Sequence, residues 1–316
     1  MTAPKISVLL PVRDGERFLA ETLESLRAQS LGDFELLAID DGSGDRTAEI
    51  LREAAARDPR LQVVGQGREG ISAALNRGLA LAKGELVARI DADDIARPSR
   101  FATQLAFLAA HPEVAAVGSD YEEIDAAGRT LRRVSLPAAP AEVRAWLPRS
   151  NCLAHPAVTM RRAAVLALGG YRRAFGRAQD YDLWLRLLDR WELANIAEPL
   201  LAYRRHATAA SALGVAEQTF AELAARLAWE RRAAGLPEGI DEARAIDRET
   251  LLAMGVSPAA VDRQLVKRFM AAARIAHRIG DRARAEALCR EAAAFVPRGD
   301  LAARFDYGWR RFKMRR

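Results

Sequence analysis

The amino-acid sequence predicts an α/β protein with a mainly parallel sheet flanked by helices, followed by an all-helical C-terminal region. Short apolar runs alternate with segments of helical periodicity through the first third of the chain, a pattern typical of βαβ units. Two acidic clusters stand directly after such runs, and the ligands of parallel sheets bind at the carboxyl ends of the strands. From Val215 onward the segments have only helical character and are rich in Ala and Arg.

The individual elements follow from these patterns. Strands are expected at the apolar runs 6–11, 34–39, 61–64 and 86–90. Helices are expected where apolar residues recur at helical spacing, over 18–26, 47–56, 71–81 and 101–109. Because strands and helices alternate in this way, the crossovers between parallel strands should be right-handed.

The pattern becomes mixed after residue 110. Strands or a hairpin are expected over 114–118 and 121–136, and a further short strand over 157–160. A helix should end at Gly169-Gly170, and another should cover 181–188. The later helical segments are broken at 235–237, 255 and 280–281, and no convincing repeat is present. These observations predict two domains, residues 1–212 and residues 213–316.

Composition places the chain among ordinary soluble globular proteins, since half of its 316 residues are hydrophobic and 28% are charged. No apolar run approaches the ~20 residues that a bilayer-spanning helix needs, and the first residues lack the layout of a signal peptide. The two cysteines, Cys152 and Cys289, are too far apart in sequence to suggest a disulfide framework or a metal-ligand pair. The expected compartment is therefore the cytoplasm.

The net charge of +6 is unevenly distributed. Residues 1–210 contain 28 basic and 28 acidic side chains, whereas residues 211–316 contain 20 and 14. A neutral first part and a basic helical part suggest a division of labour. No nucleic-acid-binding motif accompanies the positive charge, so nucleic acid is not an expected partner.

The first acidic cluster is Asp40-Asp41-Gly42-Ser43-Gly44-Asp45-Arg46-Thr47, between a strand and a helix. A carboxylate at this position can accept hydrogen bonds from a nucleobase N–H or a ribose hydroxyl, and glycine lets the backbone approach a ligand closely. The alternative is an ordinary βα turn, in which Asp45 or Thr47 caps the following helix.

The second acidic cluster is Asp91-Ala92-Asp93-Asp94, with three carboxylates in four residues at the end of a strand. Such carboxylates repel one another unless a cation or hydrogen-bond donors offset their charge. Mg²⁺ or Mn²⁺ is commonly held by one or two carboxylates together with phosphate oxygens, which suits this loop. The alternative is an acidic loop exposed to solvent.

A third group of polar residues is Gln179-Asp180-Tyr181-Asp182 at the start of a helix. Asp180 lies nearer the loop and is the candidate general base, whereas Asp182 is interpreted as a structural acid favoured by the helix dipole. His155 is also interpreted as structural. His206 follows two arginines and is a candidate contact for pyrophosphate or metal, the alternative being an exposed basic loop.

Taken together, several segments resemble the family 2 glycosyltransferases, which have the GT-A fold. The resemblance runs in order over residues 1–210 and rests on ISVLLPVRDG, FELLAIDDGSGDRT, GISAALNRGLALAKGELVARIDADD, HPAVTMRR, QDYDLWLRL and YRRH. Several independent motifs at family-like separations make it stronger than any single cluster. It does not extend to residues 211–316.

The resemblance implies a role for each matched residue. Nucleotide binding would fall to Pro11, Arg13, Asp41 and Asp91, with Asp40 a weaker candidate. Asp93 would coordinate the divalent metal, Mn²⁺ or Mg²⁺, with Asp94 assisting, and Asp180 would be the catalytic base. The chain departs from the family at Gln179, where a Glu is usual, which puts a second carboxylate role in doubt.

The implied activity is inverting transfer of a sugar from a nucleoside-diphosphate sugar to an acceptor hydroxyl. UDP, dTDP and GDP donors all fit the motifs, and the acceptor would be a glycan or a lipid-linked glycan of cell-surface polysaccharide assembly. One alternative is a nucleotidyltransferase, although no glycine-rich basic loop follows the first strand. The other is a non-catalytic nucleotide-sugar-binding or scaffold protein.

The last thirteen residues, 304–316, form a basic aromatic tail with six basic side chains and one acid. On a helix, Phe305, Trp309 and Phe312 would lie on one face. Such a segment can lie in the interface of an anionic membrane, which predicts peripheral attachment to the inner face of the cell membrane. The alternative is that the aromatic face packs on the preceding helices.

Overall fold

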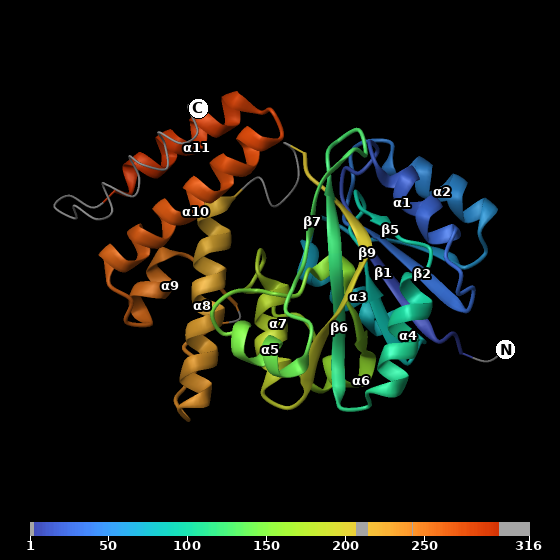
Figure 1. Ribbon diagram of the computed structural model, residues 1–316, viewed down its shortest axis with the longest axis horizontal. Helices are drawn as coiled ribbons and strands as arrows, with labels where there is room; N and C mark the ends of the chain where they lie inside the picture. The colour runs from blue at the N-terminus through green and yellow to red at the C-terminus, as the bar shows by residue number, and fades with distance from the viewer. Residues whose placement is uncertain (1–2, 207–213, 242, 297–316) are drawn as a thin grey trace. The chain divides into compact units, whose positions relative to one another are not determined.

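The computed structural model describes residues 3–206, 214–241 and 243–296 (Figure 1). The chain divides into two compact units, Met1–Arg204 and Arg205–Arg316. The predicted domain boundary at 212/213 and the basic aromatic tail both lie outside the described residues, and both therefore stay predictions.

The first unit is built around one sheet. Its strands are β1 (Ile6–Val12), β2 (Phe34–Asp40), β3 (Leu61–Gly65), β4 (Leu86–Arg89), β5 (Ile95–Ala96), β6 (Val114–Ile124), β7 (Thr130–Val134), β8 (Thr159–Arg161) and β9 (Glu192–Arg204). Within the described chain they form a nine-stranded sheet of order β3-β2-β1-β4-β8-β6-β9-β5, with β7 paired to β6. Its helices are α1 (Leu19–Arg27), α2 (Thr47–Arg57), α3 (Ile71–Leu81), α4 (Arg100–Ala110), α5 (Pro140–Trp146), α6 (Arg162–Ala167) and α7 (Gln179–Leu188), with a 3₁₀ turn at His155–Ala157.

The half of the sheet made by β3, β2, β1 and β4 is parallel. Successive side chains of a strand point to opposite faces, and here the two faces are covered by different helices. Val8 and Leu10 of β1 join α1 and α2 in one apolar core. On the other face α3 packs so closely that a Cβ at Gly78 would lie 3.0 Å or less from the side chains of Leu9 and Ile39. This is the arrangement expected of right-handed βαβ units.

Beyond β4 the sheet is mixed, because β8 runs antiparallel to both β4 and β6. The expected hairpin is present, because β6 and β7 pair antiparallel across a turn that contains Gly128, but β6 runs without a break from 114 to 124. Strand β9 was not expected from the sequence, yet it runs parallel to β6 along nearly its whole length (Figure 1). The register shifts where Pro199 lies opposite Asp120, because a proline cannot donate to the ladder.

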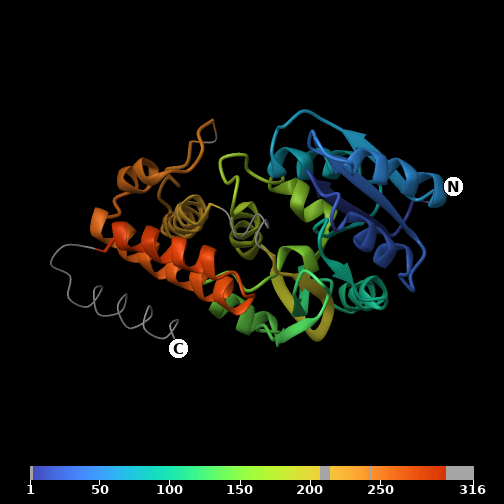
Figure 2. The same cartoon turned by 90° about the horizontal axis from the view of Figure 1, so that it is seen from above.

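The second unit is helical throughout its described part, as predicted. It contains α8 (Val215–Ala233), α9 (Arg248–Ala253), α10 (Pro258–Arg278) and α11 (Arg282–Ala294). Helices α10 and α11 lie side by side (Figure 2). The expected breaks coincide with Gly235, Gly255 and Gly280, which have φ values of 70°, 90° and 83°, the left-handed conformation that commonly ends helices.

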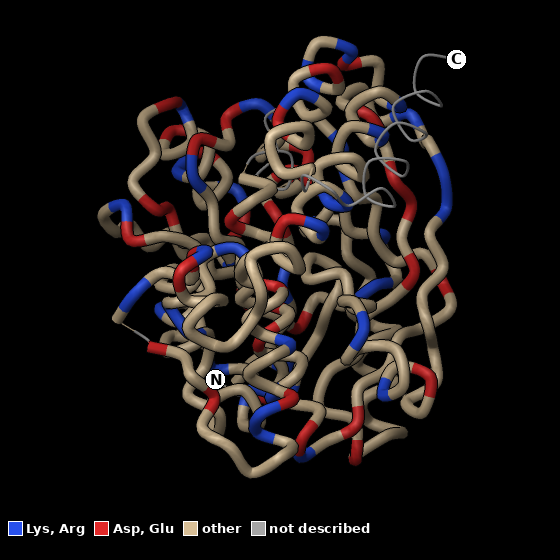
Figure 3. Tube along the Cα trace, turned by 90° about the vertical axis from the view of Figure 1, so that its left-hand side faces the viewer, with Lys and Arg blue, Asp and Glu red and all other residues tan. Residues whose placement is uncertain are grey.

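Basic and acidic residues are interspersed along the described chain (Figure 3). Among the residues that the structure describes, no helix is both long enough and apolar enough to cross a membrane.

A buried polar cluster joins β1, β2 and the turn before β4. The Ser7 hydroxyl donates to Glu35 Oε1 at 2.6 Å and accepts from the Gly84 N–H at 2.8 Å. The Lys83 N–H donates to the same Glu35 oxygen at 2.7 Å. The turn therefore lies directly against the backbone of β1.

We expect Gly84→Ala to lower the free energy of unfolding by about 1–3 kcal/mol, the usual cost of overpacking. A Cβ at Gly84 would lie 2.7 Å from the backbone nitrogen of Ser7 and 2.9 Å from the carbonyl oxygen of Leu86. The matched control is Gly32→Ala, because a Cβ there meets nothing within 4 Å. Denaturant unfolding of both variants measures the difference, and equal stabilities would contradict the packing described here.

Candidate active site

The candidate active site lies at the carboxyl ends of β1, β2 and β4. Val12 pairs with Asp40, so β1 and β2 end at the same level of the sheet. The chain then makes three adjacent turns, at 13–16, 41–47 and 91–94, which contain most of the residues singled out from the sequence. In a parallel sheet this edge is where ligands bind.

The first two turns are joined by hydrogen bonds. Asp14, with a φ of 52°, accepts from the Gly44 N–H at 2.7 Å and donates its own N–H to the Ser43 hydroxyl at 3.0 Å. The Thr47 hydroxyl accepts from the Gly15 N–H at 2.8 Å. Asp45 accepts from the Thr47 N–H at 2.9 Å beside the start of α2, although the N-cap residue of this helix is Arg46 and has no side-chain cap.

Asp41 is buried, and its carboxylate holds the turn that precedes α3. It accepts from the Gln66 side chain at 2.8 Å and from the backbone N–H groups of Glu69 and Gly70 at 2.9 and 3.0 Å. Nη1 of the exposed Arg13 lies 3.8 Å from Asp41 Oδ2. The structure thus brings Arg13 and Asp41 together at the end of β1, where Pro11 is buried opposite Ile39.

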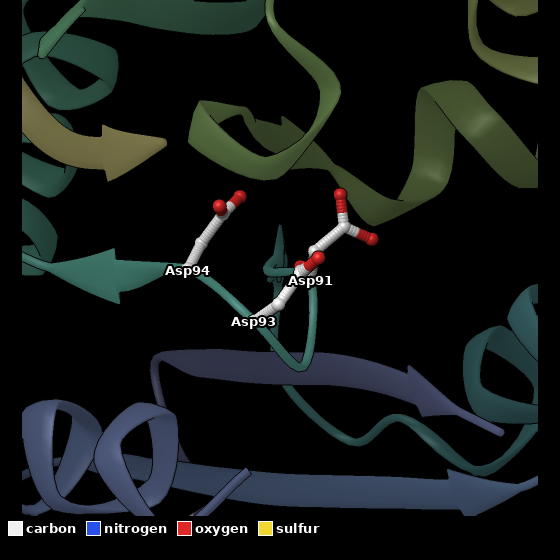
Figure 4. Close-up of side chains that lie close together, drawn as sticks. All are labelled: Asp91, Asp93 and Asp94. Carbon is white, nitrogen blue, oxygen red and sulfur yellow. The ribbon is translucent and has the colours of Figure 1, made fainter. Parts of the chain in front are cut away.

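The second acidic cluster forms a compact carboxylate group. One oxygen each from Asp91, Asp93 and Asp94 lies within 4.8 Å of the others. All three side chains project from the single turn between β4 and β5 (Figure 4). Asp91 and Asp93 are half-buried, whereas Asp94 is 1% exposed.

The carboxylates of this group repel one another electrostatically. Burial, and then the charges of Asp93 and Asp91, raise the pKa of Asp94 well above its ordinary value. Asp94 Oδ2 is buried and has no hydrogen-bond partner among the described residues. An ionised carboxylate in this position is stabilised by a nearby cation. Oxygen ligands on a single turn also suit Mg²⁺ or Mn²⁺, so these residues fit a divalent metal.

Arg204, at the end of β9, holds this turn in place. Its backbone N–H donates to Asp94 Oδ1 at 2.8 Å, and its Nε donates to the carbonyl oxygen of Asp93 at 2.8 Å. Its Nη2 reaches Glu21 at 2.6 Å, and the guanidinium lies 4.6 Å from the centre of the Phe18 ring. The buried guanidinium of Arg204 is therefore engaged by the protein itself.

His206 is half-buried and follows Arg204 by two residues, at the start of the second unit. Its role as a contact for pyrophosphate or metal stays a prediction.

A second buried arginine, Arg89 in β4, pairs with Asp91 through Nη2. Its Nε and Nη1 groups are buried without hydrogen-bond partners in the described chain. Its charge also acts to lower the pKa of Asp180. The sequence interpretation missed Arg89, although a basic residue inside an apolar strand next to three acids was a usable signal.

Asp180 is half-buried in the first turn of α7 and accepts a hydrogen bond from Asn151 Nδ2 at 2.9 Å. Burial raises the pKa of Asp180, while the Tyr181 backbone N–H, Arg89 and Asn151 oppose that rise. A carboxylate with a raised pKa is a better proton acceptor than an ordinary one. Asn151 was not singled out from the sequence.

Asp182, two residues later, is in a different environment. It is 1% exposed and forms ion pairs with Arg172 and Arg186. Because both carboxylate oxygens are engaged, Asp182 has the structural role that its sequence position suggested.

His155 is buried. It shares a hydrogen bond of 3.0 Å with the Tyr171 hydroxyl and meets Trp184 edge to face. Burial, followed by the charge of Arg89, lowers the pKa of His155 well below its ordinary value. His155 is therefore neutral and packs as part of the core. Gln179 is also buried, and its Oε1 has no partner among the described residues.

The sequence of this chain is similar to those of known proteins. The family model for Glycosyl transferase family 2 matches residues 7–169. The O-antigen biosynthesis glycosyltransferase WbnJ of Escherichia coli is 31% identical over 208 residues, covering 64% of this chain and 80% of WbnJ.

Solved structures share the fold. Residues 1–349 of S. aureus TarS in complex with UDP-GlcNAc match with a TM-score of 0.57 at 15% identity, over 90% of this chain and 89% of that one. The mannosyltransferase PcManGT from Pyrobaculum calidifontis, in complex with GDP-Man and Mn²⁺, matches with a TM-score of 0.52 at 19% identity, over 96% of this chain and 78% of that one. The fold is therefore of the GT-A type, as predicted.

Proposed function

The chain belongs to glycosyl transferase family 2, and we propose that it transfers a sugar from a nucleoside-diphosphate sugar to an acceptor hydroxyl with inversion. The acceptor is a glycan or lipid-linked glycan of cell-surface polysaccharide assembly. One observation carries this proposal: the chain has a crowded carboxylate group, Asp91, Asp93 and Asp94, and a separate carboxylate, Asp180. The charge of Arg89 acts on both.

Donor binding is assigned to the edge of the parallel sheet. Arg13 and Asp41, with Pro11 behind them, would hold the base and ribose, and Asp91 would contact the ribose. TarS binds UDP-GlcNAc and PcManGT binds GDP-Man, which supports a nucleoside-diphosphate sugar without selecting among UDP, dTDP and GDP.

A divalent metal, Mn²⁺ or Mg²⁺, would be held by Asp93 with help from its two acidic neighbours, and His206 is a further candidate contact. When bound there, it would neutralise negative charge on the diphosphate leaving group. The neighbour PcManGT contains Mn²⁺, and the orphaned oxygen of Asp94 is consistent with a nearby cation.

Asp180 would act as the general base. It would take the proton of the acceptor hydroxyl while that oxygen forms a bond to the anomeric carbon from the face opposite the diphosphate. The bond between the anomeric carbon and the diphosphate oxygen breaks at the same time, so the configuration inverts. No covalent intermediate with the protein is needed.

The second candidate function is non-catalytic nucleotide-sugar binding, and the observation in its favour is Gln179 in place of the usual Glu. A binding protein of this kind would release no nucleoside diphosphate from any donor. A release assay against a panel of nucleotide sugars, with and without metal and with lipid-linked acceptors, separates the two functions.

We expect Asp93→Ala to abolish metal-dependent donor binding in calorimetry while leaving the melting temperature nearly unchanged, because Asp93 is a half-buried member of a repulsive group. The control is Asp33→Ala, an exposed acid before β2. Donor binding by Asp93→Ala equal to that of the wild type, or full wild-type activity in excess chelator, would refute the metal assignment.

We expect Asp180→Asn to keep donor affinity and to lose about 10²-fold or more in transfer rate, as removal of a general base typically does. Its matched control is Asp182→Asn. That change should lower thermal stability, because it weakens the ion pairs to Arg172 and Arg186, but should reduce the rate per folded enzyme much less. An inactive Asp182→Asn beside an active Asp180→Asn would reverse the assignment.

The basic aromatic tail is proposed to attach the enzyme to the inner face of the membrane, near a lipid-linked acceptor. Each well-placed basic residue contributes ~1 kcal/mol to binding an anionic surface. The full chain should co-sediment with anionic liposomes at low salt and less at high salt, and a chain truncated before Arg304 should not. Equal binding by both proteins, or none by either, would show that the tail is no membrane anchor.

A further inference from the structure

Asn151 is held in one orientation beside Asp180. Its Oδ1 accepts a hydrogen bond from the Leu153 N–H at 3.1 Å, and its Nδ2 donates to Asp180 Oδ2 at 2.9 Å. Because the amide oxygen is already occupied by the backbone, the NH₂ group is the end that faces the carboxylate. A hydrogen bond to an ionised carboxylate is stronger than one between neutral groups.

The loop that carries Asn151 is anchored on both sides. Before it, the Leu147 carbonyl oxygen accepts from the Tyr181 hydroxyl at 2.8 Å, directly beside Asp180 in α7. After it, the Cys152 carbonyl oxygen accepts from the buried Asn195 side chain at 2.9 Å. The amide therefore projects from a backbone that α7 and β9 hold in place.

We propose that Asn151 is a positioning residue, which fixes the plane of the Asp180 carboxylate and so the direction in which it accepts the acceptor's proton. This inference rests on the proposed function of Asp180. A carboxylate at the first turn of a helix can otherwise rotate about its terminal bond, since this torsion has a broad energy minimum. A general base must meet the proton within hydrogen-bond geometry, so a fixed plane raises the fraction of productive encounters.

The surroundings of Asp180 suit a neutral donor at this position. The charged group that acts on it from β4 is Arg89, and the helix supplies the Tyr181 N–H. Burial raises the pKa of Tyr171 and lowers that of His155, so both are neutral, and burial raises the pKa of the Cys152 thiol to about 12. The neutral amide of Asn151 therefore stabilises the ionised Asp180 without adding a charge beside that of Arg89.

The test uses Asn151→Asp, which has the same shape and can still accept from the Leu153 N–H. It presents an oxygen instead of an NH₂ group to Asp180, so both the orientation and the stabilisation of the ionised form are lost. We expect kcat to fall about tenfold to hundredfold with the donor KM unchanged, in line with misplacement of a reacting group.

The pH profile provides a second readout. The base is active when deprotonated, so kcat/KM rises with pH through the pKa of Asp180. Loss of a donor that lowers this pKa should move the acidic limb to higher pH, and Asn151→Asp should move it further than Asn151→Ser because a second carboxylate adds repulsion. Asn151→Ser also serves if the Asp variant folds poorly.

The matched control is Asn76→Asp. Asn76 likewise uses both ends of its amide, donating to the Tyr171 carbonyl oxygen at 2.7 Å and accepting from the Tyr171 N–H at 2.8 Å. Its replacement should lower thermal stability without moving the acidic limb. A purely structural amide at 151 would behave in the same way.

Wild-type kcat and an unmoved acidic limb in folded Asn151→Asp and Asn151→Ser would overturn the inference. Asp180→Asn distinguishes this failure from a failure of the proposed function. If Asp180→Asn is inactive while the Asn151 variants are unaffected, the base assignment stands and the positioning role falls. If Asp180→Asn is fully active, the base assignment falls, and the positioning role with it.

Discussion

The site depends on the crowding of three carboxylates on one four-residue turn. Such a turn would be unfavourable if its charges were unopposed, and two buried arginines keep it in place. Arg89 pairs with Asp91 from inside the sheet, and Arg204 binds Asp94 and the backbone of Asp93 from the end of β9. Neither arginine saturates Asp94, so the turn is held in place while Asp94 Oδ2 has no partner in the part of the chain that the structure describes.

The topology explains how distant segments reach this turn. Strand β8 runs antiparallel between β4 and β6 and turns the sheet from parallel to mixed. Strand β9 then pairs with β6, and its last residue lies against the carboxylate group. Helix α7, which precedes β9, places Asp180 within the electrostatic reach of Arg89. The first half of the fold thus supplies the three turns of the candidate site, and the second half supplies Asp180 and Arg204.

What could be predicted from the sequence is what local pattern determines. Helix α3 has the predicted bounds, and the strands before residue 90 differ from prediction by a residue or so at their ends, because each is a short, mainly apolar run. Strand β9 was missed because Glu198 and Pro199 break its alternation, and its pairing with β6 and β5 makes it a strand. The carboxylates at the site were visible as clusters, whereas Asn151 lies in a loop without any local signal.

The carboxylates of this site therefore have different roles, which depend on the partners that the protein supplies to each. Asp182 accepts from Arg172 and Arg186 at both of its oxygens, which suits it to hold other side chains. Asp180 accepts from the Asn151 side chain and is also acted on by the Tyr181 backbone N–H, and in the described part of the chain Asp94 Oδ2 is buried without a partner. Sequence motifs cannot express this difference, because it arises from segments far away along the chain. The partners of each carboxylate, more than the motif that contains it, distinguish Asp182, which is held by two arginines, from Asp94, whose Oδ2 has no partner among the described residues.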